Sequence, residues 1–103
     1  MEVETHFIPY MTIEEFAEKN NLLMVITERS LGMDDPLRFY AHFKKCEVKG
    51  YGVLISTYGN GATPDAAVEH YARKIELTTL VCNAFSSKNR KEIQVPRLKI
   101  RGM

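Results

Sequence analysis

Apolar residues recur at spacings of three and four over two stretches of the chain, which predicts two amphipathic helices. The first stretch begins at Thr12, where Thr-Ile-Glu-Glu is typical of a capping box, and ends near Asn20. The second begins after Thr63, a favoured N-cap residue that precedes Pro64 at the first helical position. Its apolar stripe consists of Ala67, Val68, Tyr71, Ala72 and Ile75. We therefore expect the longer helix to lie on a sheet.

Three strands are predicted between the helices from alternation and from β-branched residues. They cover residues 22–29, 37–49 and 53–58, with a loop over 30–36 and a tight turn over 50–52. The sequence thus predicts an α+β fold, in which a three-stranded antiparallel meander carries the helices on one face. The order is helix, strand, strand, strand, helix, followed by short C-terminal strands.

The second predicted strand has two unlike faces. Phe39, Ala41 and Phe43 share one face and predict its core side. The opposite face carries Arg38, Tyr40, His42 and Lys44. Aromatic and charged side chains on an outer sheet face are typical of protein interfaces.

Glycines on either side of Asn60 precede the second helix and predict a sharp turn with positive φ at Gly59 and Gly61. A glycine turn before a helix is also typical of phosphate-binding loops. However, the dinucleotide pattern and the Gly-Lys-Ser/Thr ending are both absent, and Asp65 would repel a phosphate at this helix end. The turn is interpreted as structural.

The C-terminal part continues with a strand over 78–85, a polar turn over 86–90 and an extended run over 92–95, which Pro96 ends. In the segment 97–103, basic and apolar residues alternate, which fits either an edge strand or an unfolded arm. The 103 residues form one predicted domain, with residues 1–10 as an N-terminal arm and 97–103 as a basic tail.

The net charge of +1 is unevenly distributed. Residues 88–103 contain six basic residues against the single acid Glu92, or +5, and the other 87 residues carry 8 basic and 12 acidic residues, or −4. The six are Lys88, Arg90, Lys91, Arg97, Lys99 and Arg101. They are the candidate nucleic-acid-binding residues of an alternative function.

The candidate chemistry is sparse. The histidines at positions 6, 42 and 70 are scattered, and no Cys and His pair has metal-ligand spacing, so neither a metal nor a cofactor is expected. Cys46 is predicted on the polar face of its strand as an inert thiol, and Cys82 as a second reduced thiol. Without a nucleophile elbow or a phosphate cradle, we expect a protein that is not an enzyme.

The longest apolar run, Leu22 to Ile26, is too short to span a membrane. No basic segment precedes an apolar signal stretch, so we expect the protein in the cytoplasm of the cell that makes it.

The element order resembles that of double-stranded-RNA-binding domains, whose glycine and second-helix start correspond to residues 59–67. That family grips phosphates with lysines at this helix start, whereas this chain has Pro64 and Asp65 and no lysine there before Lys74. The same segment is also similar to antitoxin-type α+β modules.

Three segments, residues 11–17, 58–64 and 92–96, resemble short accessory proteins of bacteriophages and prophages. This resemblance implies a viral protein that acts by stoichiometric binding to a bacterial host protein, for example a defence nuclease such as a CRISPR effector. It implies no catalytic residues. The expected partner-binding residues are Tyr40, His42, Lys44 and Tyr58.

Overall fold

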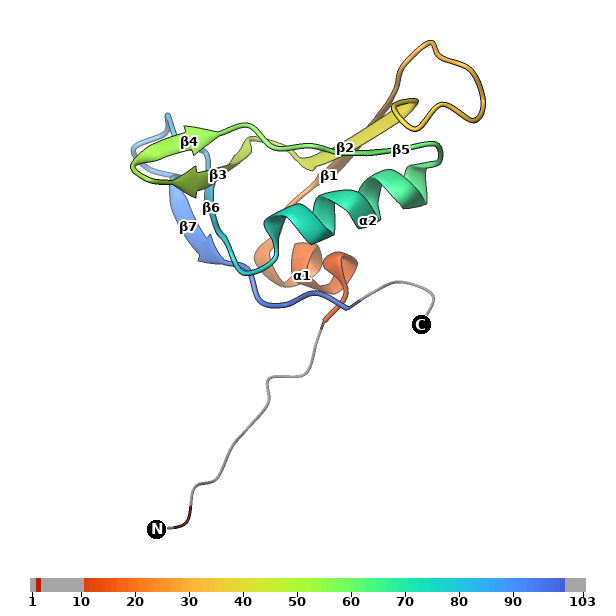
Figure 1. Ribbon diagram of the computed structural model, residues 1–103. Helices are drawn as coiled ribbons and strands as arrows, with labels where there is room; N and C mark the ends of the chain where they lie inside the picture. Colours follow the sequence, from red (N-terminus) through yellow and green to blue (C-terminus); the bar gives the residue numbers. More distant parts are fainter. Residues whose placement is uncertain (1, 3–10, 100–103) are drawn as a thin grey trace.

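In the computed structural model, which describes residues 2 and 11–99, two helices pack with two antiparallel sheets (Figure 1). The helices are α1 (Ile13–Asn20) and α2 (Pro64–Ile75). The strands are β1 (Met24–Glu28), β2 (Phe39–Phe43), β3 (Cys46–Gly50), β4 (Val53–Ile55), β5 (Gly59–Gly61), β6 (Thr79–Cys82) and β7 (Lys91–Gln94). One sheet has the order β1-β2-β5 and the other β4-β3-β6-β7. The α+β class predicted from the sequence is confirmed.

The predicted strand over 37–49 is in fact two strands, β2 and β3, which belong to different sheets. A turn at Lys44 and Lys45 separates them, and Lys45 has a φ of 59°. The predicted strand over 53–58 stops early in the same way, because β4 ends at Ile55 and the chain enters the first sheet as β5. The chain therefore crosses between two sheets instead of forming one meander.

Gly59 and Gly61 do not form the predicted sharp turn. They lie in β5, paired with Ala41 and Phe39 of β2, and neither has a positive φ; among the glycines that the structure describes, only Gly52 does. A Cβ atom at Gly59 would lie 2.1 Å from the backbone nitrogen of Tyr71, and one at Gly61 would lie 2.4 Å from that of Ala67. Glycine is required at both positions because the backbones of β5 and α2 are in contact.

The predicted start of α2 is confirmed, and α2 is also attached to β5 by a side chain. The Thr63 hydroxyl accepts a hydrogen bond of 3.1 Å from the Ala66 N–H, and Pro64 occupies the first turn. His70 Nδ1 accepts the backbone N–H of Asn60 at 2.8 Å, which requires the neutral tautomer with its proton on Nε2. His70 thus fixes the position of α2 against β5.

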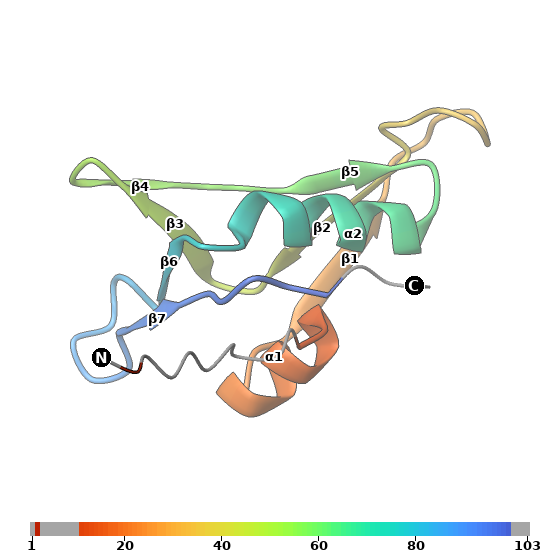
Figure 2. The same ribbon diagram turned by 60° about the horizontal axis from the view of Figure 1, so that its bottom comes forward.

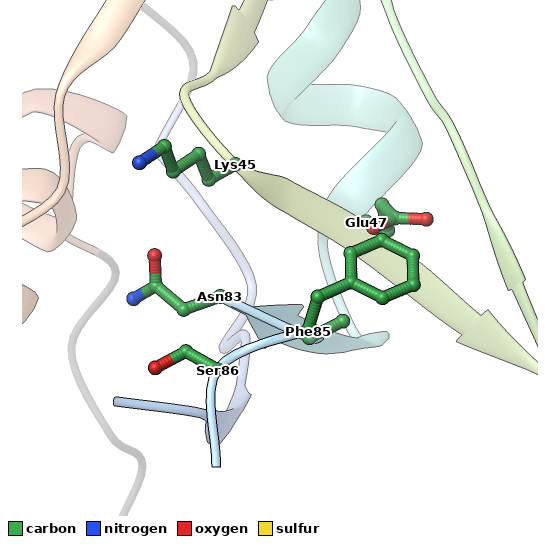
Figure 3. Close-up of a pocket in the computed structure, with 6 residues that line it drawn as sticks. Lys45, Glu47, Asn83, Phe85 and Ser86 are labelled. Atoms are coloured by element: carbon green, nitrogen blue, oxygen red, sulfur yellow. The ribbon is translucent and has the colours of Figure 1, made fainter. Parts of the chain in front are cut away.

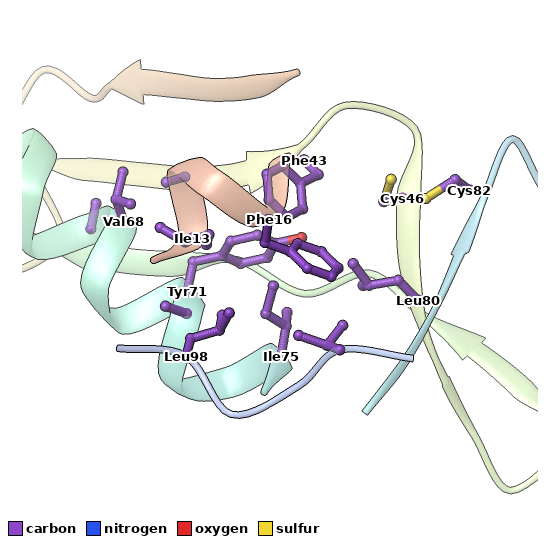
Figure 4. Packing of buried hydrophobic residues seen from close by; sticks show 14 residues of the cluster. Ile13, Phe16, Phe43, Cys46, Val68, Tyr71, Ile75, Leu80, Cys82 and Leu98 are labelled. Atoms are coloured by element: carbon purple, nitrogen blue, oxygen red, sulfur yellow. The ribbon is translucent and has the colours of Figure 1, made fainter. Parts of the chain in front are cut away.

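The core lies between the inner face of β2 and the two helices, which occupy the same side of the first sheet (Figures 1 and 2). Three rings are at its centre: Phe43 is 6.1 Å from Phe16 of α1 and 5.5 Å from Tyr71 of α2 (Figure 4). All five predicted apolar residues of α2 are buried. The predicted core side of β2 is confirmed, since Ala41 and Phe43 are completely buried.

Cys46 and Cys82 face each other across β3 and β6, and both are buried free thiols (Figure 4). The expected position of Cys46 on a polar face is wrong, because the turn at Lys44 and Lys45 changes the phase of the alternation. Burial, together with a hydrogen bond to Cys82, raises the pKa of the Cys46 thiol far above its ordinary value. The thiol is therefore un-ionised and unreactive at neutral pH.

The beginning of the predicted basic tail is fixed to the core. Leu98 is buried; its N–H donates to Glu76 Oε1 at 3.1 Å and its carbonyl accepts from Arg73 Nη2 at 2.7 Å. Lys99 N–H donates to the carbonyl of Met11 at 2.8 Å, beside a parallel bridge between Met11 and Leu98. Residues 97–99 are thus neither a ladder strand nor an unfolded arm. The predicted arm over 1–10, apart from the exposed Glu2, and residues 100–103 lie outside the described part of the chain.

Candidate partner-binding face

Three aromatic rings lie together on the outer face of the first sheet. Tyr40 and His42 point away from the core because they alternate with the buried Ala41 and Phe43 along β2. Their ring centroids are 6.3 Å apart with nearly parallel planes. Tyr58, from the segment between β4 and β5, contacts both rings edge-on at 5.7 and 5.5 Å. The sequence placed these three residues in one site, and the structure brings them together.

Arg29 completes this cluster and was not predicted. Its guanidinium carbon lies 4.3 Å from the centroid of the Tyr40 ring. The Nη1 atom donates to the Leu37 carbonyl at 2.6 Å and to Asn60 Oδ1 at 3.0 Å, which holds the guanidinium in place. Arg29 follows β1, whose Thr27 pairs with Tyr40, so strand alternation places Arg29 on the same face. The position of Arg29 on this face follows only from the pairing of β1 with β2, which the sequence does not specify.

A hollow of about 330 Å³ adjoins the three rings, where the two sheets meet. Ser56 and Thr57 line it beside Tyr58, and Lys45 and Glu47 contribute one charge of each sign. Tyr58 remains 43% exposed, although it packs against two other rings. Aromatic rings beside a hollow lined by hydroxyl and charged groups can pack against a partner's side chain and bind its polar atoms.

Lys44, the fourth predicted partner-binding residue, does not belong to this cluster. The turn after Phe43 directs the chain into the second sheet, and Lys44 lines a different hollow together with Lys45 and Lys91. The alternation that grouped Lys44 with Tyr40 and His42 ends at that turn.

The described members of the six candidate nucleic-acid-binding residues do not form one continuous surface. Lys91 Nζ donates to the carbonyl of Asn20 at 2.7 Å, at the end of α1, whereas the backbone of Lys99 binds Met11, just before α1 begins. Arg97 and Lys99 are exposed beside that start, while Lys88 and Arg90 lie in the loop between β6 and β7. Arg101 lies outside the described residues.

Part of this positive charge is neutralised within the protein. Arg90 pairs with Glu92 at 3.2 Å, and Lys49 of β3 pairs with the same carboxylate at 3.2 Å. The hydrogen bond from Lys49 and its charge hold the pKa of Glu92 below its usual range. Only part of the segment is therefore available to a phosphate backbone.

Within residues 2 and 11–99, no group of three or more His, Cys, Asp or Glu side chains is placed to hold a metal ion. The same residues contain no helix of the length and apolar character needed to cross a membrane. No protein-family model, curated protein or solved structure matches this chain.

Proposed function

We propose that this protein is a non-catalytic binding protein whose aromatic face, defined as Arg29, Tyr40, His42 and Tyr58, docks onto a partner protein. The observation that carries the proposal is the preorganised contact of three partly exposed rings with a guanidinium held by two hydrogen bonds. Tyrosine and arginine are enriched among the residues that dominate binding energy at interfaces.

The aromatic face has low conformational freedom before it meets a partner. Tyr40 and His42 lie within a paired strand, and Arg29 is bonded to the loop at Leu37 and to Asn60 of β5. Immobilising a flexible side chain on binding costs about 0.5–1.5 kcal/mol. Because much of that ordering exists already in the free protein, more of the contact energy contributes to affinity.

The partner we propose is a bacterial host protein, and a defence nuclease is the first class to test. The resemblance of three segments to bacteriophage accessory proteins supports this choice. Stoichiometric inhibition needs an exposed docking surface, and the aromatic face supplies one.

The test compares two variants in affinity capture from a bacterial host, followed by binding measurements with each captured and purified protein. Tyr40→Ala with Tyr58→Ala removes two rings of the aromatic face. Tyr51→Ala is the control, because Tyr51 is completely exposed at the turn between β3 and β4. We expect the double variant to lose at least a hundredfold in affinity and the control to bind as the wild type does.

For the defence-nuclease class, purified CRISPR effectors are assayed for DNA cleavage with increasing protein. Inhibition that saturates at one equivalent and disappears in the double variant supports the proposal. A partner that binds the double variant as tightly as the wild type refutes the role of the aromatic face. Inhibition that persists in that variant would place the inhibitory surface elsewhere.

A further inference from the structure

A second hollow, of about 470 Å³, lies between the end of α1, the β2–β3 turn and the loop that joins β6 to β7. Lys44, Lys45 and Lys91 line it, and among the residues that the structure describes no acidic side chain lines it. Lys44 and Lys45 are neighbours in the β2–β3 turn, and the fold brings the distant Lys91 beside them. A concave site with three ammonium groups and no carboxylate in its wall favours an anion.

The backbone around this hollow has an unusual conformation. Asn21, Lys45 and Asn83 all line it, and all three have a positive φ, at 56°, 59° and 56°. Each borders a regular element: Asn21 follows α1, Asn83 follows β6, and Lys45 precedes β3. The turns at these three residues therefore contribute to the wall of the hollow.

Two hydrogen bonds hold the lining in position. Lys91 Nζ donates to the Asn20 carbonyl at 2.7 Å, which fixes the ammonium group and leaves two of its three protons for a ligand. Asn83 Nδ2 donates to the Asn89 carbonyl at 3.2 Å and so anchors the loop between β6 and β7.

A helix C-terminus ordinarily repels anions, and the end of α1 borders this hollow. Three carbonyl groups in its last five residues accept hydrogen bonds from side chains or from the chain beyond the helix, which reduces the negative potential that they present to the hollow. Phe16 accepts from Asn20 Nδ2 at 2.9 Å, Ala17 from the Leu22 N–H at 2.8 Å, and Asn20 from Lys91. The positive charge of the three lysines therefore predominates in the hollow.

We infer that this hollow binds the phosphate group of a nucleotide, either free or within single-stranded nucleic acid. Its volume falls in the range of about 300–1,000 Å³ that is usual for small-molecule sites. Leu22 and the 60% exposed Leu23 supply an apolar wall for a base, and the amides of Asn21 and Asn89 supply groups that can bind its edge.

A neighbouring hollow of about 450 Å³ shares Lys45 and Asn83 with the lysine-lined one. Figure 3 shows the side chains of Lys45 and Asn83 extending to one side and Phe85 standing on the other. Phe85 is 99% exposed, an unusual position for a phenylalanine. Base stacking on such a ring contributes about 1–3 kcal/mol in proteins that bind single strands. Glu47 also lines this second hollow and would repel a phosphate there, so a ligand longer than one nucleotide would place its phosphate at the lysines and a base beside Phe85.

The first experiment titrates the ¹⁵N-labelled full chain with pyrophosphate, an anion without a base. We expect amide shifts at residues 21–23, 44–45, 83 and 89–91. Lys44→Gln with Lys91→Gln should weaken binding at least tenfold, whereas Lys49→Gln with Lys74→Gln, which removes equal charge from exposed sites outside the hollow, should leave it unchanged. Because Lys91 also bonds to α1, Lys44→Gln alone is measured as well and should lose about threefold in affinity for pyrophosphate.

Three outcomes would overturn the inference: amide shifts elsewhere in the chain, no binding at millimolar pyrophosphate, or equal losses of affinity in the two double variants.

Competition with pyrophosphate then identifies the source of the phosphate. If ATP displaces it more effectively than a single-stranded oligonucleotide, the ligand is a free nucleotide. If the oligonucleotide competes better and loses affinity with Phe85→Ala, the ligand is a nucleic acid. Failure of both to compete would exclude nucleotides and overturn the inference.

Discussion

The position of a Cβ atom on Gly59 is already filled by the backbone of Tyr71, whose nitrogen lies 2.1 Å from it, and by the Ala67 carbonyl oxygen at 2.2 Å. Strand β5 and helix α2 are therefore in backbone contact along the strand. Peptide groups cannot move aside as a flexible side chain can, so a substitution here must separate β5 from α2.

We predict that Gly59→Ala lowers the free energy of unfolding by about 3 kcal/mol or more, because the added methyl overlaps two backbone atoms of α2. Urea denaturation measures the change. Gly32→Ala is the matched control, since nothing lies within 4 Å of a Cβ there and its φ is not positive. Equal midpoints for Gly59→Ala and the wild type would show that the contact between β5 and α2 is not as close as described.

Replacement of Thr63 by Val should cost about 1 kcal/mol, because the Ala66 N–H loses the hydroxyl that accepts it at 3.1 Å. Thr63→Ser keeps the hydroxyl and should cost much less. Thermal unfolding followed by circular dichroism distinguishes the two variants. If serine costs as much as valine, the stabilisation at this position comes from the threonine methyl group and not from the cap.

Leu98→Ala should destabilise the fold by about 2–5 kcal/mol, since the side chain is buried in the core cluster. The control is Leu77→Ala, which should change stability by less than about 0.5 kcal/mol because the side chain is 63% exposed.

Truncation after Ser87 is expected to unfold the protein, because it removes β7, Val95 and Leu98 together with the basic residues. The contribution of the basic residues in 88–103 to nucleic-acid binding must therefore be tested with point substitutions instead of truncation.

Stability should decrease at alkaline pH. Burial raises the pKa of both the Cys46 thiol and the Tyr71 hydroxyl, so the folded chain keeps protons that the unfolded chain releases above about pH 9–10. The unfolded state then binds fewer protons than the native state, and the free energy of unfolding falls by up to about 1.4 kcal/mol per pH unit for each group. Urea denaturation from pH 8 to 11 measures the slope. Cys46→Ala with Tyr71→Phe should flatten it, and an unchanged slope in that variant would assign the alkaline loss to other groups.

Helix positions could be predicted from the sequence because their signals are local. Thr12 with Glu15 and Thr63 with Pro64 specify where α1 and α2 begin within a few residues of chain. The division of 37–49 into two strands could not be predicted in this way. The turn there depends on a positive φ at Lys45, a residue with no special preference for that conformation.

The glycines of β5 show a different limit of prediction from the sequence. A glycine is required either by a positive φ or by the close approach of another backbone, and the sequence pattern around Gly59 and Gly61 is the same in both cases. Three of the four predicted partner-binding residues lie together, because Tyr40 and His42 alternate along β2 and Tyr58 immediately precedes β5, which pairs with β2. Arg29 and the lysine-lined hollow depend on contacts between distant segments, so no local pattern points to them.

The bridge between Met11 and Leu98 joins positions separated by 87 residues, and it has a consequence for synthesis on the ribosome. At about 5–20 residues per second, roughly 4–17 s pass between the addition of Met11 and that of Leu98. During that interval Ile13 and Phe16 have been synthesised, but Leu98, which belongs to the same core cluster, has not. The core can therefore be completed only after nearly the whole chain has been made, and until then part of its apolar surface has no partner.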